Sequence, residues 1–163
     1  MPGSEDYYKN EAFRIFQEGY ERQIEGQVEE AISLYQKSIE IFPTAEAYTF
    51  LGWAYSFRGQ YDQAIEECRK AIEVDPDFGN PYNDIGAYLI EEGKLDEAIP
   101  WLEKAKSAKR YESYCFPHYN LGRVCEKKGD WTNAMACYVQ AVKENPCYTL
   151  AKRAINQLLA MMN

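Results

Sequence analysis

The sequence has a single histidine, His118, and no two cysteines separated by two residues. Structural zinc sites combine four Cys and His ligands in closely spaced pairs, so this scarcity argues against a metal centre. Cys115 and His118 stand three residues apart, which is the spacing of half a site, but no second pair completes it. We therefore expect no bound metal, and we expect His118 to fill a packing position between helices.

Membrane segments and secretion signals are also missing. No stretch approaches the ~20 consecutive apolar residues of a membrane-spanning helix. Residues 1–8 contain no apolar run of the kind found in a secretory signal. The five cysteines are odd in number, and three of them fall inside helical patterns, which is typical of reduced, buried cysteine rather than of a disulfide framework. We therefore expect a cytoplasmic protein with no membrane partner.

An excess of positive charge is absent as well. The 18 Lys and Arg residues stand against 26 Asp and Glu residues, which gives a net charge of −8. Nucleic acids and anionic membranes attract proteins that present a basic face. We therefore exclude both as general partners, while a basic protein partner stays compatible with this charge.

Signatures of catalysis are missing too. The glycines lie singly at long intervals and form no loop that would cradle a phosphate group. Paired carboxylates such as Glu66-Glu67 are expected on solvated outer faces or helix ends rather than as an acid–base pair. We expect no catalytic residue, no cofactor and no enzymatic activity.

What the sequence does contain is a repeat. One glycine recurs at intervals of 33, 34 and 36 residues, at Gly19, Gly52, Gly86 and Gly122. Series of alanine, of a second glycine and of proline keep step with it. Their members are Ala31, Ala64, Ala98 and Ala134; Gly26, Gly59, Gly93 and Gly129; and Pro43, Pro76 and Pro146, with Arg110 in place of the third proline. This shared spacing indicates one structural unit written four times.

Each unit is predicted to hold two α-helices. Between the markers, apolar residues recur every three or four positions, which is the spacing of one helix face. Residues 1–6 are polar and small, and we expect them to fray. Asp62 is expected to cap the start of its helix. Pro100 is expected in the first turns of its helix, where a missing N–H matters little.

Small residues at the recurring positions explain why the helices would pair. A helix of about 14 residues is marginal by itself, and glycine or alanine lets two backbones approach closely. A side chain at Gly86 or Gly122 would overpack the pair, at a cost of about 1–3 kcal/mol. Stacking four such pairs buries a continuous core and leaves a curved surface. A last helix, residues 148–163, is expected to cover the open end of the array.

These units resemble tetratricopeptide repeats, whose pattern is Trp-x2-Leu-Gly-x2-Tyr, then Ala-x3-Phe, then Pro. The first unit shows the pattern weakly, and the second shows it as Tyr48, Leu51, Gly52, Tyr55, Ala64, Cys68 and Pro76. The resemblance implies an all-α fold, namely a right-handed α-solenoid of four antiparallel helix pairs with a C-terminal capping helix. The whole chain, residues 1–163, would form a single repeat domain. The expected repeats span residues 12–44, 45–78, 79–114 and 115–147.

The resemblance also implies a binding groove, because in this family the first helix of each pair lines the concave face. Aromatic anchors give a large contact area at little entropic cost, and asparagine can bond the edges of an extended peptide. Some of the aromatic residues would alternatively pack between neighbouring first helices. The predicted groove is aromatic in its first half and amide-rich in its second. Its candidate residues are Phe13, Phe16, Tyr20, Phe50, Trp53, Phe57, Asn80, Asn83, Asp84, Phe116, Tyr119, Asn120 and Arg123.

The function implied by the resemblance is a non-enzymatic protein–protein interaction module. It would act as an adaptor, scaffold or co-chaperone that binds a peptide segment or a helix of a partner, and bacterial secretion chaperones form one such subclass. We do not expect the carboxylate clamp known in one subgroup, because the matching positions lack its cations. The basic connector 109–114 is read as an ordinary solvated connector, with an acidic stretch of a partner as the other reading. The alternative function is a self-associating structural scaffold whose groove is filled by another copy, so a homo-oligomer stays open.

Overall fold

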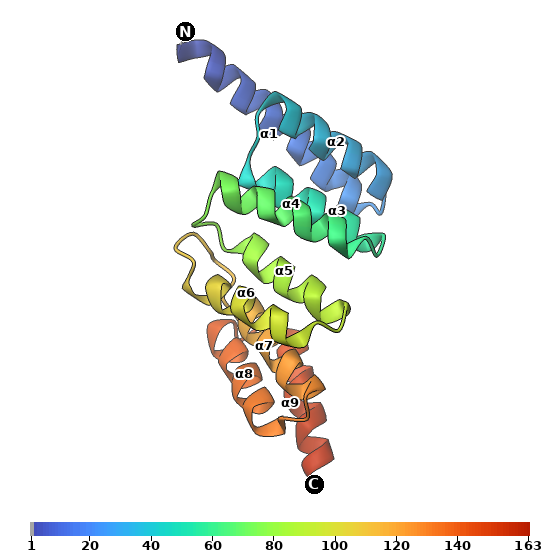
Figure 1. The fold of residues 1–163 in the computed structure, drawn as a ribbon, viewed down its shortest axis with the longest axis vertical. Coiled ribbons are helices and arrows are strands. Elements are labelled where there is room, and N and C mark those ends of the chain that lie inside the picture. The colour runs from blue at the N-terminus through green and yellow to red at the C-terminus, as the bar shows by residue number, and fades with distance from the viewer. Residues whose placement is uncertain (1) are drawn as a thin grey trace. The chain divides into compact units, whose positions relative to one another are not determined.

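A computed structural model of the protein describes residues 2–163. The described residues form nine α-helices that follow one another in antiparallel pairs, and their only β-type pairing is an isolated bridge between Phe78 and Arg110 (Figure 1). The chain divides into two compact units, Met1–Pro76 and Asp77–Asn163, which are described separately. The all-α class predicted from the sequence is confirmed.

The first unit contains two helix pairs. Its helices are α1 (Pro2–Ile24), α2 (Val28–Ile41), α3 (Ala45–Phe57) and α4 (Tyr61–Val74). The prediction that residues 1–6 fray is wrong from Pro2 onward, since α1 begins there. A proline at the first helical position lacks only an N–H that would have no partner anyway. A 2.7 Å ion pair between Glu5 and Lys9, one helical turn apart, supports the same segment.

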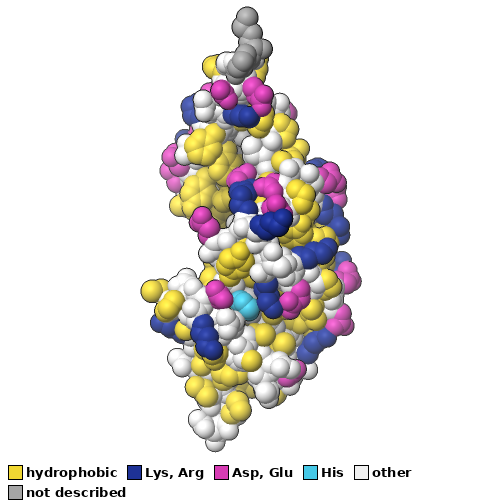
Figure 2. Space-filling model, turned by 90° about the vertical axis from the view of Figure 1, so that its left-hand side faces the viewer, with side chains coloured by type: hydrophobic (Ala, Val, Ile, Leu, Met, Phe, Trp, Pro, Cys, Tyr) yellow, Lys and Arg dark blue, Asp and Glu magenta, His cyan; other side chains and the backbone are white. Residues whose placement is uncertain are grey.

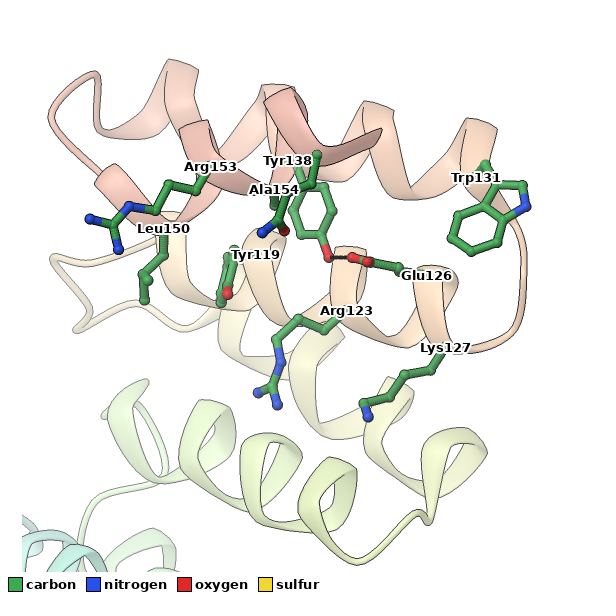
Figure 3. A pocket seen from close by; sticks show the side chains of 10 residues that line it. Tyr119, Arg123, Glu126, Lys127, Trp131, Tyr138, Leu150, Arg153 and Ala154 are labelled. Atoms are coloured by element: carbon green, nitrogen blue, oxygen red, sulfur yellow. Dashed lines mark hydrogen bonds between the residues drawn. The ribbon is translucent and has the colours of Figure 1, made fainter. Parts of the chain in front are cut away.

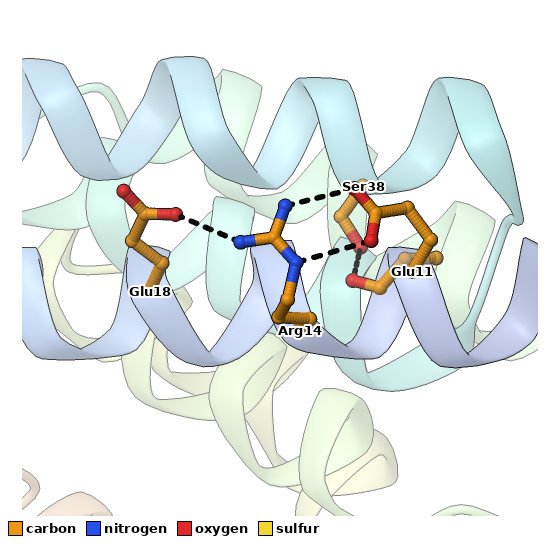
Figure 4. A network of polar contacts seen from close by, with 5 residues as sticks. Glu11, Arg14, Glu18 and Ser38 are labelled. Atoms are coloured by element: carbon orange, nitrogen blue, oxygen red, sulfur yellow. Dashed lines mark hydrogen bonds and ion pairs between the residues drawn. The ribbon is translucent and has the colours of Figure 1, made fainter.

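Helix α1 carries an exposed ion cluster of its own, and a buried hydrogen bond joins it to α2 (Figure 4). On the exposed side, Arg14 donates to both carboxylate oxygens of Glu11, at 2.8 and 3.0 Å, and lies 3.7 Å from Glu18. Between the helices, the buried Ser38 hydroxyl donates to the carbonyl oxygen of Ala12 at 2.7 Å. Exposed ion pairs contribute at most about 1 kcal/mol, whereas an unbonded Ser38 hydroxyl would leave a buried polar group without a partner.

The second unit contains two helix pairs and a final single helix. Its helices are α5 (Asn80–Glu91), α6 (Leu95–Ser107), α7 (Cys115–Lys127), α8 (Trp131–Glu144) and α9 (Thr149–Met162). Helix α9 packs against α8 through the buried residues Ala151, Ala154 and Leu158. It therefore covers the last repeat, while Leu159 on its outer side is 48% exposed.

The recurring glycines mark the places where paired helices approach most closely. A Cβ atom added at Gly52 would lie 2.8 Å from the carbonyl oxygen of Ala64, and one at Gly122 would lie 2.5 Å from the Tyr138 ring. Both distances are shorter than ordinary van der Waals contact. The second glycine series serves the turn between the two helices of each pair. Its four members, Gly26, Gly59, Gly93 and Gly129, have positive φ, from 69° to 82°, which glycine adopts without strain.

Tyr35 covers Gly19 in the first repeat, and Tyr138 covers Gly122 in the last repeat. The Tyr35 hydroxyl donates to Gln23 Oε1 at 2.7 Å, and the Tyr138 hydroxyl donates to Glu126. Each tyrosine lies 12 residues beyond its acceptor. Burial raises the pKa of both tyrosines and so keeps their hydroxyls protonated as donors. A tyrosine ring over a glycine, with an acceptor at the same position in the repeat, thus recurs in both repeats.

The residues that cap the helices agree only in part with those expected from the sequence. Thr44 caps α3 by accepting from the Ala47 N–H at 3.1 Å, and Asp130 caps α8 in the same way. The prediction that Asp62 caps its helix is wrong, because α4 begins after Gln60, whose side chain makes no capping bond. Asp62 lies inside the first turn, where its charge still suits the positive end of the helix dipole.

Helix α6 continues through Pro100 from Leu95 to Ser107. The Ala98 N–H donates to the Lys94 carbonyl at 3.1 Å, so the helical bonding has already begun two residues before the proline. Pro100 therefore removes one regular bond, the one that would reach Asp96, and leaves the helix otherwise intact.

The structure explains why Arg110 replaces the third proline. The Arg110 N–H donates to the Asp77 carbonyl at 2.9 Å, and the Arg110 carbonyl accepts from the Gly79 N–H at 3.0 Å. The guanidinium lies 4.1 Å from the centre of the Phe78 ring. A proline has no N–H to donate, so it would lose the bond to Asp77, one of the two backbone bonds that hold the connector between α6 and α7.

We expect Gly52→Ala to lower the free energy of unfolding by about 1–3 kcal/mol, because the new methyl group would press on backbone that cannot move aside. Urea unfolding followed by circular dichroism measures the change. Gly3→Ala is the matched control, since a Cβ there would meet nothing within 4 Å. Equal stability of the two variants would contradict the close approach of α3 and α4.

We expect Arg110→Pro to be less stable than Arg110→Ala by about 1–2 kcal/mol. Both variants lose the guanidinium on Phe78, and only the proline variant loses the N–H that bonds Asp77. Thermal unfolding of the two proteins side by side isolates that one bond. If the two midpoints coincide, the backbone bond does not hold the connector.

Candidate peptide-binding surfaces

In the first unit, the six aromatic candidates form one continuous row, which we call the aromatic row. It is built by α1 and α3, whose facing sides bring the rings together. Neighbouring ring centres lie 5.2–6.4 Å apart. The members are Phe13, Phe16, Tyr20, Phe50, Trp53 and Phe57. These separations are typical of edge-to-face and offset aromatic contacts.

The aromatic row has an anchored interior and exposed outer members. Phe16 and Phe50 are half-buried and contact the core residue Tyr35, with ring centres 5.7 and 6.2 Å away. Phe13 and Phe57 are 58% and 60% exposed. The inner rings therefore pack between first helices, as the alternative reading proposed, while the outer rings leave apolar surface open. Figure 2 shows, on one face, hydrophobic side chains gathered toward the N-terminal end with charged side chains around them.

A cavity of about 350 Å³ lies at the Phe13 end of the aromatic row. Phe42 lines it together with Phe13 and Phe16, and the Lys9 ammonium lies 5.3 Å from the centre of the Phe42 ring. The remaining lining residues are Ser38, Thr44 and Glu46. The cavity extends the apolar surface beyond the residues that the sequence singled out.

In the second unit, the amide candidates bond one another across two helices. Asn120 Nδ2 on α7 donates to Asn83 Oδ1 on α5 at 3.0 Å, and both side chains are buried. Arg123 donates to Asn120 Oδ1 at 3.2 Å and to Glu91 at 2.5 Å. These groups therefore join α5 to α7, and the bonds exist without any bound peptide.

Asp84 lies beside this network, where Asn83 Nδ2 donates to its carboxylate at 3.4 Å. Burial raises the pKa of Asp84 from an ordinary 3.8 to about 7, because the charged form is poorly solvated there. Its remaining neighbour among the candidates, Asn80, is half-buried and lines a separate cavity of about 300 Å³ beneath the connector 110–113. The acid of the predicted groove is thus partly protonated near neutral pH.

The aromatic candidates of the fourth repeat form their own cluster with a residue that the sequence did not single out. Tyr148, at the start of α9, has its ring centre 5.3 Å from both Phe116 and Tyr119. Phe116 is 39% exposed. This placement depends on the return of the chain after α8, which spacing within a repeat cannot reveal.

A larger cavity, of about 670 Å³, opens among α7, α8 and α9, and we call it the basic pocket (Figure 3). Two predicted residues, Tyr119 and Arg123, line it. Sequence reasoning missed the others, which are Glu126, Lys127, Trp131, Tyr138, Leu150, Arg153, Ala154 and Gln157. One signal pointed there: residues 115–163 hold six Lys and Arg against three Asp and Glu, in a chain of net charge −8.

Metal and membrane chemistry find little support in the described residues. Over residues 2–163, no cluster of three or more His, Cys, Asp or Glu side chains is arranged to hold an ion. His118 is half-buried, like Tyr48 and Tyr82 at the same repeat position, and burial lowers its pKa. In the same range, no helix combines the length and the apolar character that crossing a bilayer requires.

Comparison with known proteins identifies the class. Sequence models of the tetratricopeptide repeat match residues 45–78, 80–111 and 115–146, which together make up more than half of the chain. The protein belongs to the tetratricopeptide repeat family, whose members are protein-interaction modules. The family prediction from the sequence is confirmed.

Curated relatives share part of their length with this chain. It is 33% identical over 104 residues to the small glutamine-rich tetratricopeptide repeat-containing protein 2 of Mycosarcoma maydis, covering 63% of this chain and 29% of that protein. It is 28% identical over 108 residues to the photosystem I assembly protein Ycf3 of Prochlorococcus marinus, covering 60% of this chain and 62% of that protein. The chain thus spans less than two thirds of the length of these relatives.

Solved structures confirm the helical repeat solenoid. PilF of Pseudomonas aeruginosa is similar with a TM-score of 0.85 and 24% identity, over 94% of this chain and 70% of that one. YrrB, described as a TPR protein with an unusual peptide-binding site, is similar with a TM-score of 0.69 and 20% identity, over 88% of this chain and 73% of that one. At such identities the likeness shows the fold alone, and the right-handed superhelix stays a prediction.

We expect the stability of the protein to fall as pH rises from about 4 to about 7, because the folded state keeps a proton on Asp84 that the unfolded chain releases. Asp84→Asn should remove this loss and gain on the order of 2 kcal/mol over the wild type at about pH 8, and little at about pH 4. Urea unfolding at both pH values measures the difference. Glu112→Gln, which alters an exposed carboxylate of the same unit, is the control. An equal gain at both pH values would contradict the raised pKa.

Proposed function

We propose that the protein is a non-enzymatic interaction module that binds an apolar or aromatic segment of a partner protein, as an extended peptide or as an amphipathic helix. The observation that carries this proposal is the aromatic row of the first unit, in which half-buried rings hold exposed ones in place. Fixed aromatic rings offer a large contact area without much loss of side-chain entropy on binding. Adaptor, scaffold and co-chaperone roles all use such a surface.

The net charge of the first unit indicates which charge the bound partner segment should carry. Residues 1–76 contain fifteen Asp and Glu against seven Lys and Arg. A partner segment with an apolar face and flanking Lys or Arg would complement this field, and an acidic one would be repelled. The proposal therefore favours a basic amphipathic segment.

The protein is proposed to work in the cytoplasm. The described cysteines are all free of disulfides, including the exposed Cys147. Free thiols suit a reducing compartment such as the cytoplasm. Nucleic acid is not among the proposed partners, because the acidic balance of the chain disfavours it.

The test compares partner recovery by three forms of the purified protein. We expect Phe13→Ala/Phe57→Ala to lose the partners that the wild type recovers from cells of the source organism, because it removes the two most exposed rings of the row. Val74→Ala/Val139→Ala, which shortens exposed apolar residues on α4 and α8, should keep them. Quantitative mass spectrometry of the recovered proteins provides the readout, and identical partner sets for all three forms would reject the role of the row.

The second candidate function, a self-associating scaffold, rests on the same exposed rings. Light scattering after size-exclusion chromatography separates the two candidates. The proposed function gives a monomer for the wild type and for both double variants. A wild-type dimer that is lost only in Phe13→Ala/Phe57→Ala would instead establish that another copy fills the row.

A further inference from the structure

The basic pocket of the second unit is formed by residues with no role in the aromatic row. Its floor contains Tyr138, whose hydroxyl donates to Glu126, and this bond fixes the one carboxylate among the lining residues. Arg123 and Lys127 come from α7, four positions apart and therefore on one helix face. Arg153 comes from α9, so two helices supply the cations (Figure 3).

The cations of the pocket are not all satisfied within the fold. Arg123 bonds Asn120 and Glu91. Lys127 and Arg153 are exposed, and neither side chain makes a hydrogen bond or ion pair with any residue in the described range 2–163. Arg123 is paired with Glu91, and the one carboxylate that lines the pocket, Glu126, is bonded to Tyr138, so two cations stay without an anionic partner. Such a site attracts an anion from outside, with a strength that depends on the salt concentration because both cations face water.

The C-terminal segment that forms the pocket, residues 115–163, is net positive, whereas the whole chain is net negative. Residues 115–163 hold six Lys and Arg against three Asp and Glu, whereas the whole chain carries −8. A positive field over one region of an acidic protein orients an approaching acidic chain toward that region. Nucleic acid, the other common polyanion, would be repelled by the remainder of the protein.

The pocket also presents apolar surface beside its charges. Trp131 is 41% exposed and Leu150 is 47% exposed, and both line the cavity together with Tyr119. A volume of about 670 Å³ lies within the range of natural ligand pockets. The preferred ligand therefore carries an apolar side chain next to its anionic groups, which describes a short peptide better than a small inorganic ion.

We propose that the basic pocket binds an acidic segment of a partner protein, with carboxylates at Lys127 and Arg153 and a neighbouring apolar side chain against Trp131 and Leu150. The carboxylates come from Asp and Glu side chains within that segment. This site is independent of the proposed role of the aromatic row. It gives the protein a second contact, of opposite charge preference, in its other unit.

Fluorescence anisotropy with labelled octapeptides tests the proposal. The probe set is a library of Asp- and Glu-rich peptides that each contain one Leu, Phe or Trp, measured against the full-length protein at low salt. We expect binding by members of this library, weakening as salt is added. The same peptides with Asn and Gln in place of Asp and Glu should not bind, and amidation of the peptide carboxyl terminus should leave binding unchanged.

Matched charge variants locate the binding. Lys127→Ala/Arg153→Ala should weaken peptide binding about tenfold or more. Lys143→Ala/Lys152→Ala removes the same charge from exposed positions outside the pocket and should change the affinity less than about twofold. Circular dichroism checks that all variants stay folded. Absence of binding across the library, equal binding of the Asn and Gln peptides, loss of binding on amidation of the carboxyl terminus, or equal losses in the two double variants would each overturn the proposal.

One further outcome has its own readout. If light scattering shows oligomers of the wild type that dissociate in Lys127→Ala/Arg153→Ala, the occupant is an acidic surface of a second copy, and the proposal of a separate partner is overturned. Phe13→Ala/Phe57→Ala should leave peptide binding at the basic pocket unchanged. Failure of one surface is therefore distinguishable from failure of the other.

Discussion

The close approach of two paired helices at a glycine is the contact on which the rest of the structure depends. At Gly52 and Gly122 there is no room for a further carbon atom between the helices. Because the backbones lie so near each other, residues such as Tyr138 can cover the gap and bury their rings fully. A single pair would bury too little to be stable, so the repetition of this contact, and the cover that α9 provides, are both required.

One residue that departs from the repeat pattern makes a contact that the repeat residue could not make. Arg110 stands where a proline is expected, because its N–H is bonded to the Asp77 carbonyl and its side chain covers Phe78. The pairing of Tyr35 with Gln23 recurs as Tyr138 with Glu126, although the acceptor has become charged. The repeat pattern thus conserves the place of a bond within the chain while allowing its chemistry to change.

The two units offer surfaces of different character. The first combines acidic surroundings with the aromatic row, and the second combines a basic pocket with a few exposed apolar side chains. Surfaces of opposite charge favour segments of opposite charge. Asn83 and Asn120, expected to face a peptide, bond each other and so join α5 to α7 inside the second unit.

The sequence by itself determined the helical repeat, the paired helices and the aromatic row, because each of these depends on spacing along one or two neighbouring helices. It also predicted the family, through residues such as Gly52 and Ala64 that recur with the packing. Tertiary structure alone decided the basic pocket, since Lys127 and Arg153 come from different helices, α7 and α9, which are brought together by packing on α8 and by the contact of Tyr148 with Tyr119. It also decided that Asn120 is used inside the fold, because burial and bonding partners depend on which helices pack, a property that local periodicity does not encode.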